Sequence, residues 1–124
     1  MVRTKEQIIE EIDKLPEEIM KTMQRLDNIQ KNREIVDKEL SGMKYRLIQD
    51  IATELGEDGK PKFKNEDLRK AELDSRMKSS PKYVDLFNQG KDLQNKESYA
   101  VIEIDFFKNR MKSIEIQAKL WAGN

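Results

Sequence analysis

The sequence predicts an all-α protein whose two long helices form an antiparallel hairpin, similar to a coiled coil. Two stretches, residues 8–47 and 83–121, carry apolar residues at heptad spacing, and a connection that contains glycine and proline separates them. A heptad pattern of this length is typical of coiled coils, because an isolated globular helix rarely keeps a strict 3.5-residue period beyond about 20 residues. The first seam consists of Ile8, Ile12, Leu15, Ile19, Thr22, Leu26, Ile29, Arg33, Val36, Leu40, Met43 and Leu47, and the second seam consists of Tyr83, Leu86, Gly90, Leu93, Glu97, Ala100, Ile104, Phe107, Met111, Ile114, Ala118 and Trp121.

The composition is that of long, solvated helices. The chain has 124 residues, of which 39% are charged, with three prolines and five glycines. Disorder is the competing interpretation, but the unbroken heptads supply the apolar residues that disordered segments lack. We expect one domain spanning residues 1–124. Because there is no cysteine and no apolar run long enough to cross a membrane, we also expect a cytoplasmic protein without disulfides or membrane association.

The first helix is expected over residues 5–55. Thr4 is a suitable N-cap, and Gln7 three residues later completes a capping-box pattern. Pro16 cannot donate a backbone hydrogen bond, so it predicts either a kink or a separate short helix. The heptad phase continues through it, which favours the kink. Gly56 offers a left-handed C-cap at the end of this helix.

A connection with its own short helix is expected next. Asp58 and Gly59 give the strongest turn signal in the chain. A short helix is expected over residues 66–78. Asn65 is its expected N-cap, because the side-chain oxygen can accept a hydrogen bond from the first turn.

The last helix is expected over residues 81–121. Ser80 is its expected N-cap, and Pro81 occupies the first helical position, where proline is favoured. Residues 99–107 are rich in β-branched and aromatic side chains and resemble a strand locally. Heptads on both sides of this segment, and the absence of bounding turn residues, favour a helix.

Two seams of similar length, joined by a connection, fold most simply as an antiparallel hairpin. Two registers are possible, in which facing residues have numbers that add up to about 126 or about 133. In either register Arg33 and Glu97, the only charged residues on the two seams, fall in neighbouring layers. We therefore expect them to form a pair that fixes the register.

Both helices carry more apolar residues than their seams can bury. A lone two-helix hairpin would leave these side chains in water, so we expect a homodimer in a four-helix arrangement. The alternative is that some of them form a face that binds a partner protein. The candidate interface residues are Val101, Ile102, Phe106, Met20 and Met23.

The residue types argue against catalysis. The chain has no histidine and no cysteine, which removes the commonest general base, the commonest thiol nucleophile and most transition-metal ligands. Residues 56–60 lack the spacing of a phosphate-binding loop and of a calcium-binding loop. Carboxylates at helical spacing alternate with lysines, as on a solvated outer face. We therefore expect no catalytic residues, no cofactor, no metal and no small-molecule substrate.

The middle of the chain is its one electropositive part. Residues 60–82 hold eight Lys or Arg and four Asp or Glu, a net charge of +4, whereas residues 1–59 have a net charge of −4. Clustered lysines attract backbone phosphates, and Phe63 could stack on an exposed base. The alternative, which we favour, is that Phe63 anchors the loop on the tip of the hairpin while the lysines keep it soluble. The candidate nucleic-acid contacts are Lys60, Lys62, Phe63, Lys64, Arg69 and Lys70.

Short motifs in this region carry a resemblance to known proteins. They are Lys60-Pro61-Lys62-Phe63, Asn65-Glu66 followed by Arg69-Lys70-Ala71, and Pro81 with Tyr83 at the start of the terminal helix. Over roughly residues 55–120 the chain resembles small charged helical proteins encoded by phages and integrative elements of Gram-positive bacteria. Such proteins often sit among replication and recombination genes. The resemblance therefore implies an accessory role, and it carries over no catalytic residue.

These observations predict a non-enzymatic protein–protein interaction module, whose partner the sequence does not name. The alternative is a nucleic-acid-binding accessory factor for recombination or replication that acts through residues 60–82. A prefoldin-like holdase is a third hypothesis, which rests on the hairpin shape alone.

Overall fold

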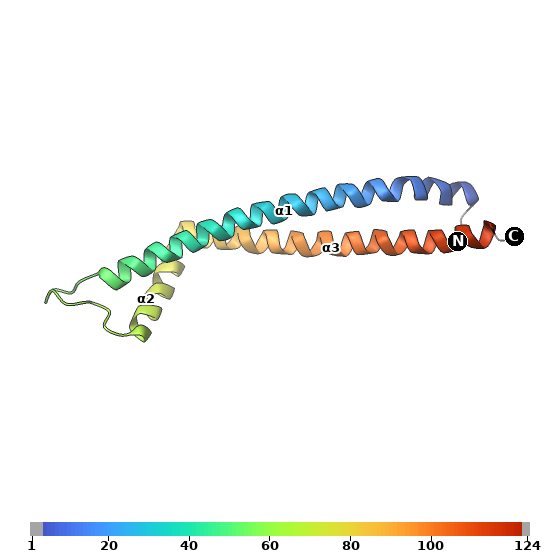
Figure 1. Cartoon of the computed structure of the whole chain (residues 1–124). Coiled ribbons are helices and arrows are strands. Elements are labelled where there is room, and N and C mark those ends of the chain that lie inside the picture. The colour runs from blue at the N-terminus through green and yellow to red at the C-terminus, as the bar shows by residue number, and fades with distance from the viewer. Residues whose placement is uncertain (1–3, 123–124) are drawn as a thin grey trace. The chain divides into compact units, whose positions relative to one another are not determined.

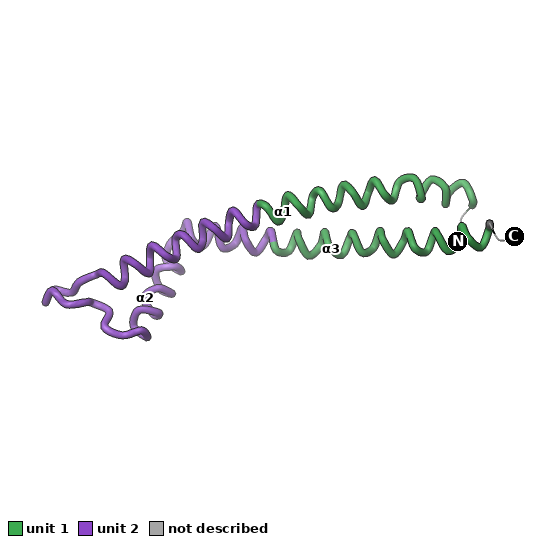
Figure 2. Tube along the Cα trace, in the orientation of Figure 1, with its two compact units in different colours: residues 1–31, 94–124 green, residues 32–93 purple. Residues whose placement is uncertain are grey.

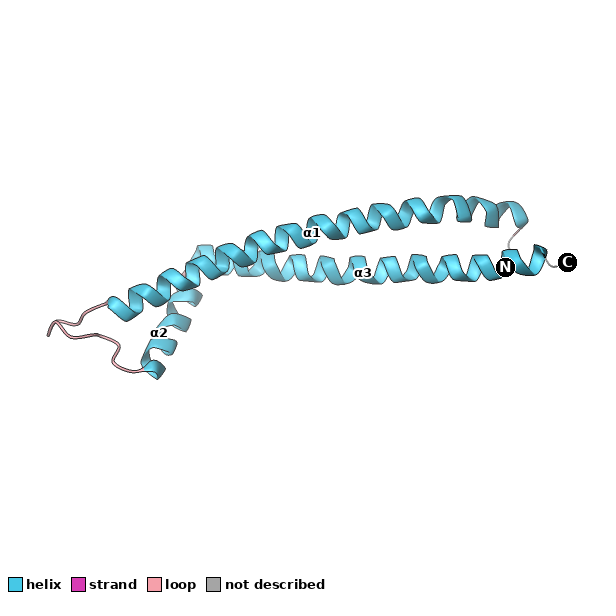
Figure 3. Cartoon of the chain, viewed as in Figure 1, coloured by secondary structure: helices cyan, strands magenta, loops and turns pink. Residues whose placement is uncertain are grey.

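A computed structural model describes residues 4–122 and contains three α-helices (Figure 1). They are α1 (Lys5–Thr53), α2 (Glu66–Ser79) and α3 (Pro81–Ala122). No strand occurs in this range, and the remainder is loop, including the connection between α1 and α2 (Figure 3). The all-α fold class is confirmed, and the strand-like segment 99–107 lies inside α3.

The helices are grouped in two compact units, which Figure 2 colours separately. Unit 1 consists of the described part of residues 1–31 and 94–124, and unit 2 consists of residues 32–93. Both α1 and α3 therefore contribute a segment to each unit, whereas α2 belongs to unit 2 alone. The contacts between helices are those of a helical bundle. The expectation of a single domain stays a prediction.

α1 begins with the capping box that its sequence predicts. The Thr4 N–H donates to Gln7 Oε1 (2.9 Å), and the Gln7 N–H donates to Thr4 Oγ1 (3.2 Å). The helix then continues through Pro16 without a break, so the alternative of a separate first helix is wrong. Pro16 removes one backbone hydrogen bond. Buried seam residues lie on both sides of it, Leu15 before and Thr22 after, so the seam continues through the proline.

The two predicted caps of the connection are also present. The Asn65 side chain accepts a hydrogen bond from the Leu68 N–H (2.8 Å), which starts α2. The Ser80 hydroxyl accepts one from the Tyr83 N–H (3.3 Å), and Pro81 is the first residue of α3. Side chains therefore satisfy donors that the first turns of both helices leave open.

α1 ends differently from the prediction. Its last residue is Thr53, and Gly56 lies in the loop without the left-handed conformation expected of a C-cap. The chain turns back instead through Gly59, the predicted turn glycine, which has a positive φ of 74°. The Lys62 N–H donates to the Glu54 carbonyl (3.0 Å). Backbone pairing across the turn therefore takes the place of a glycine cap.

The core of unit 1 lies between the first part of α1 and the last part of α3. Ile8, Leu15 and Ile114 form a buried cluster, and Phe107 and Met111 pack against it while partly exposed. All five are seam residues. The seams therefore face each other within this unit, as the heptad pattern predicts.

The seams also meet within unit 2. A Cβ added at Gly90 would lie 3.5 Å from Val36 Cγ1, so α3 comes into contact with α1 at this glycine. Val36 and Leu86 are each 8% exposed, and Ile51 is 2% exposed. Val36 and Gly90 are partners in the register of 126 and not in that of 133. Taken by itself, unit 2 supports the first register.

Candidate interaction surfaces

Two ion pairs join α1 to α3 within unit 1. Arg110 binds Glu11 through two hydrogen bonds, Nε to Oε2 (3.2 Å) and Nη2 to Oε1 (3.1 Å). Arg25 Nη2 lies 2.8 Å from Glu103 Oε2. As α1 proceeds from one pair to the next, α3 runs backwards, so the two segments are antiparallel in this unit. Sequence analysis missed these pairs, although all four residues directly precede a seam residue, a position that pairs across coiled coils.

The buried hydroxyl of Thr22 is satisfied within the first seam. Thr22 is 1% exposed, and its hydroxyl donates to the Glu18 carbonyl (2.8 Å). The same hydroxyl accepts a hydrogen bond from Arg25 Nη2 (3.3 Å). Because both bonds form inside α1, Thr22 is a structural polar residue and not a candidate binding group.

The side of α3 that faces away from the seam carries a second series of residues at heptad spacing. All of them are uncharged, and the five apolar ones are between 60% and 72% exposed. Asn109 and Ser113 separate the apolar residues into two groups. Exposed apolar groups of this kind mark interaction sites on soluble proteins. Sequence analysis did not identify the series as a whole, although its spacing is visible there. We call it the α3 outer stripe, and it consists of Tyr99, Ile102, Phe106, Asn109, Ser113, Ile116 and Leu120.

Phe106 has a defined place on this stripe. Its ring meets that of Phe107 edge to face, with 5.8 Å between centroids and 64° between planes. Phe107 packs in turn against the buried cluster of unit 1. The core of the unit therefore orients the Phe106 ring, which nonetheless remains 61% exposed.

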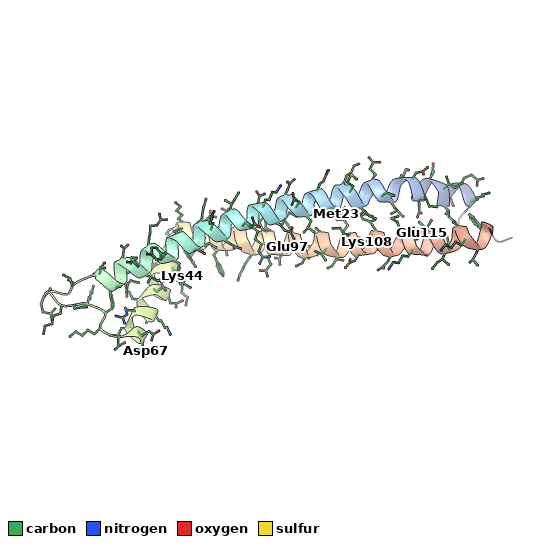
Figure 4. The ribbon with its side chains drawn as sticks, viewed as in Figure 1. Met23, Lys44, Asp67, Glu97, Lys108 and Glu115 are labelled. Carbon is green, nitrogen blue, oxygen red and sulfur yellow. The ribbon has the colours of Figure 1, made fainter. Side chains whose placement is uncertain are left out.

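α1 has an apolar hollow on its own exposed surface in unit 1. Met20 is 63% exposed and Met23 is 51% exposed, and Figure 4 labels Met23 on this segment. Methionine side chains adapt to partners of different shape, so such a hollow suits protein binding. We call it the α1 groove, and it is lined by Pro16, Ile19, Met20, Met23, Gln24, Asp27 and Asn28.

The five candidate interface residues are divided between these two surfaces. Met20 and Met23 line the α1 groove, whereas Ile102 and Phe106 lie on the α3 outer stripe. Val101 is 43% exposed beside the stripe. The residues therefore belong to two surfaces on different helices and do not form one patch.

The predicted nucleic-acid segment is held by ion pairs of its own. Lys62 Nζ lies 3.4 Å from Glu54 Oε1, and Arg76 binds the other oxygen of the same carboxylate. Arg76 also pairs with Glu72 (2.8 Å). Phe63 is half-buried, with Lys62 Nζ and the Arg76 guanidinium 5.6 and 5.8 Å from its ring centroid. These contacts agree with an anchoring role for Phe63.

The same cluster shifts two pKa values. The hydrogen bond from Arg76, together with the charges of Arg76 and Lys62, holds the pKa of Glu54 below its usual value. Hydrogen bonds to Glu54 and then Glu72 raise the pKa of Arg76. Both groups are therefore charged at neutral pH, which keeps the end of α1 tied to α2.

The other candidate nucleic-acid contacts are exposed. Lys70 pairs with Glu66 along α2 (3.4 Å). Lys60, Lys64 and Arg69 make no ion pair within the part of the chain that the structure describes. These three side chains are the ones that remain available to a phosphate.

The register pair stays a prediction. Arg33 belongs to unit 2 and Glu97 to unit 1, and Figure 4 labels Glu97 on α3. Both side chains occupy half-buried seam positions. Arg33 Nε also lies 4.0 Å from Asp37 on its own helix.

Two further kinds of site were sought in residues 4–122. In this range, no three Asp or Glu side chains are grouped so that they could hold a metal ion. No described helix is both long enough and apolar enough to cross a membrane.

Comparison of the chain with protein-family models, with curated proteins and with solved structures found no match in any of the three. The assignment of function therefore depends on the surfaces described above.

Proposed function

We propose that this protein is a non-enzymatic helical hairpin that binds another protein through apolar surfaces outside its seams. The observation that supports the proposal best is the exposure of the α3 outer stripe and the α1 groove in a chain that is 39% charged. Exposed apolar side chains gain free energy when a partner removes them from water. Binding is therefore what these surfaces are suited to do.

The hairpin is the simplest chain path that agrees with both units. The α1 and α3 segments run antiparallel in unit 1, and Val36 meets Gly90 in unit 2. Both observations fit the register in which facing residue numbers add up to 126. A hairpin in this register would hold both surfaces on long, stiff helices.

The biological setting that we propose is a cytoplasmic accessory protein of a phage or mobile element. The resemblance of residues 55–120 to such proteins supports this setting. A chain without histidine or cysteine supports a binding role over a catalytic one. The function proposed here requires no cofactor and no small-molecule substrate.

Partner capture from a bacterial lysate, with and without nuclease, tests the proposal. The tagged chain is compared with Met20→Glu/Met23→Glu, which places charge in the α1 groove. The matched control is Lys60→Glu/Lys64→Glu, which also changes two exposed side chains. Capture should survive nuclease, be lost in the methionine variant and persist in the lysine variant, because apolar contact and not phosphate attraction drives it.

The alternative function is nucleic-acid binding through residues 60–82. It is favoured by the charges of Lys60, Lys64 and Arg69, which make no ion pair within residues 4–122. Titration of a labelled single strand at about 150 mM salt separates the two functions. We expect weak binding, unchanged in the lysine variant. Capture that nuclease abolishes, together with submicromolar strand binding that the lysine variant loses, would establish the alternative instead.

A further inference from the structure

The part of the α3 outer stripe that follows Tyr99 is symmetric about its midpoint. Its six residues are apolar, apolar, polar, polar, apolar and apolar in order, and the steps between them are four, three, four, three and four. Both sequences of properties are unchanged when the order is reversed. They belong to Ile102, Phe106, Asn109, Ser113, Ile116 and Leu120.

We propose that the α3 outer stripe joins two copies of this chain, side by side and antiparallel, into a homodimer. Phe106 of one copy then faces Ile116 of the other, and Ile102 faces Leu120. The dimer rests on the proposed function, because it assigns a second copy to one of the two surfaces. The other surface, the α1 groove, is left to the partner protein.

The symmetry selects one arrangement of the two copies. An axis perpendicular to the helices pairs each residue with the one at the mirrored position, so an isologous antiparallel contact needs a symmetric stripe. A parallel pair needs no such symmetry, because each residue meets its own copy. The next antiparallel register places Ile102 against Ser113 and Phe106 against Asn109. Apolar side chains would then cover a hydroxyl and an amide, and these polar groups would lose their hydrogen bonds to water without gaining a partner.

Charges on one edge of the stripe complement an antiparallel copy. Asp105, Lys112 and Lys119 lie on this edge, and none of them makes an ion pair within residues 4–122. The ion pairs across the seam of unit 1 show which edge positions meet in an antiparallel pair of these helices. Relative to the sum of 126 for facing residues, the residue numbers of the two pairs add up to five less (Glu11 and Arg110) and two more (Arg25 and Glu103). The same two spacings bring Asp105 of one copy between Lys112 and Lys119 of the other. They also place the two Lys112 side chains opposite each other at the two-fold axis, where each has an Asp105 carboxylate of the facing copy beside it. Two-fold symmetry forms the contact twice.

The opposite edge of the stripe is already neutralised. Glu103 is bound to Arg25, and Arg110 is bound to Glu11. An antiparallel copy therefore meets no uncompensated charge on this side. A parallel copy would instead bring Asp105 to Arg110, whose guanidinium already binds a carboxylate through two hydrogen bonds.

Disulfide trapping tests the direction of the two copies, since the natural chain has no cysteine. Phe106→Cys and Ile116→Cys are made separately in the full chain, then oxidised alone and as a mixture. We expect covalent dimers chiefly between the two variants, because positions 106 and 116 share a layer. Identical positions lie ten residues, or about 15 Å, apart in the antiparallel pair. Rapid crosslinking of Phe106→Cys with itself would overturn the antiparallel arrangement.

Sedimentation equilibrium of purified protein tests the surface itself. Ile102→Asp should raise the dimer dissociation constant on the order of 100-fold, because symmetry buries the new charge twice. The control is Ile35→Asp, which changes an isoleucine of similar exposure (58%, against 64% for Ile102) in unit 2 and should leave the constant within a few-fold. Circular dichroism should report unchanged helicity for both. A monomeric wild-type chain, or equal weakening by both variants, would overturn the dimer.

The experiments can disprove the dimer and the partner-binding function independently of each other. The dimer measurements contain no partner, so a monomeric result leaves capture through Met20 and Met23 untouched. Conversely, a dimer that forms as expected while capture is unaffected by Met20→Glu/Met23→Glu would remove the proposed partner site alone.

Discussion

The outer face of α3 changes character between the two units, whereas its seam does not. In unit 2 the outer positions hold Asp85, Asn88 and Asp92, and in unit 1 the same heptad positions form the largely apolar α3 outer stripe. The seam is mostly apolar in both and contains buried residues in both, with Leu86 8% exposed and Ile114 2% exposed. A polar outer face is therefore compatible with packing against α1. We propose that the apolar one in unit 1 serves a contact that a single chain does not make.

The two units also differ in how charge fixes their helices. In unit 1, Arg110 and Arg25 reach directly across the seam to carboxylates of the facing helix. In unit 2, Glu54, which directly follows α1, binds Arg76 of α2 and Lys62 of the loop. Unit 1 is thus an apolar seam with ion pairs on its edge. Unit 2 adds a short helix and a loop, and the Glu54 carboxylate forms an ion pair with each of them.

The largest expected effect separates the two faces of α3 in unit 1. Ile114→Ala removes a side chain from the buried cluster, so it should lower the free energy of unfolding by about 2–5 kcal/mol. Ile116→Ala alters an isoleucine that is 60% exposed on the outer stripe, and it should change that value by less than about 0.5 kcal/mol in the monomer. Urea denaturation at low protein concentration measures both. Equal losses would mean that the outer face is packed within the chain.

An intermediate effect tests how the two units are joined. In the proposed hairpin Arg33 of unit 2 and Glu97 of unit 1 fall in neighbouring layers. Arg33→Ala should cost about 1–3 kcal/mol, because a half-buried carboxylate loses a compensating cation. Replacing both residues with leucine should recover most of this loss. A double-mutant cycle in urea measures the coupling, and strictly additive losses would show that the two side chains do not meet.

Local patterns in the sequence predicted the features that depend on local physics. Burial of Ile8, Leu15 and Ile114 follows from heptad spacing, because a helix turns the same face inward every three or four residues. The caps at Asn65 and Ser80 follow from side chains that reach the next turn of the same segment. Neither inference depends on which other segment of the chain packs against the helix.

Features that depend on distant residues were missed or only partly predicted. The pair of Glu11 and Arg110 requires the register between helices at opposite ends of the sequence, which two alternatives left undecided. Sequence analysis favoured anchoring of Phe63 over base stacking, but it could not identify Arg76 of α2 as the residue that contacts the ring. The outer stripe was recognisable from its spacing, but its exposure depends on where α1 packs.

The smallest expected effect concerns the loop of unit 2 and depends on pH. The hydrogen bond from Arg76 lowers the pKa of Glu54 in the folded chain, so the ion pair stabilises the fold at neutral pH. This contribution is lost as pH falls through the lowered pKa, where Glu54 becomes protonated. Glu54→Gln should therefore reduce the urea midpoint slightly at about pH 7 and leave it unchanged at about pH 2. The midpoint shift should be smaller than that of Arg33→Ala, because Glu54 and Arg76 remain in contact with solvent.

The matched control for this experiment is Glu57→Gln, which changes an exposed acid of the same loop that has no ion pair among the described residues. It should leave the urea midpoint unchanged at both pH values. Salt at about 1 M should also shrink the effect of Glu54→Gln at neutral pH, because exposed charges are screened. If Glu54→Gln still lowered the urea midpoint at low pH and high salt, Glu54 would stabilise the loop through packing and not through its charge. The two units would then differ in their outer faces but not in their use of charge.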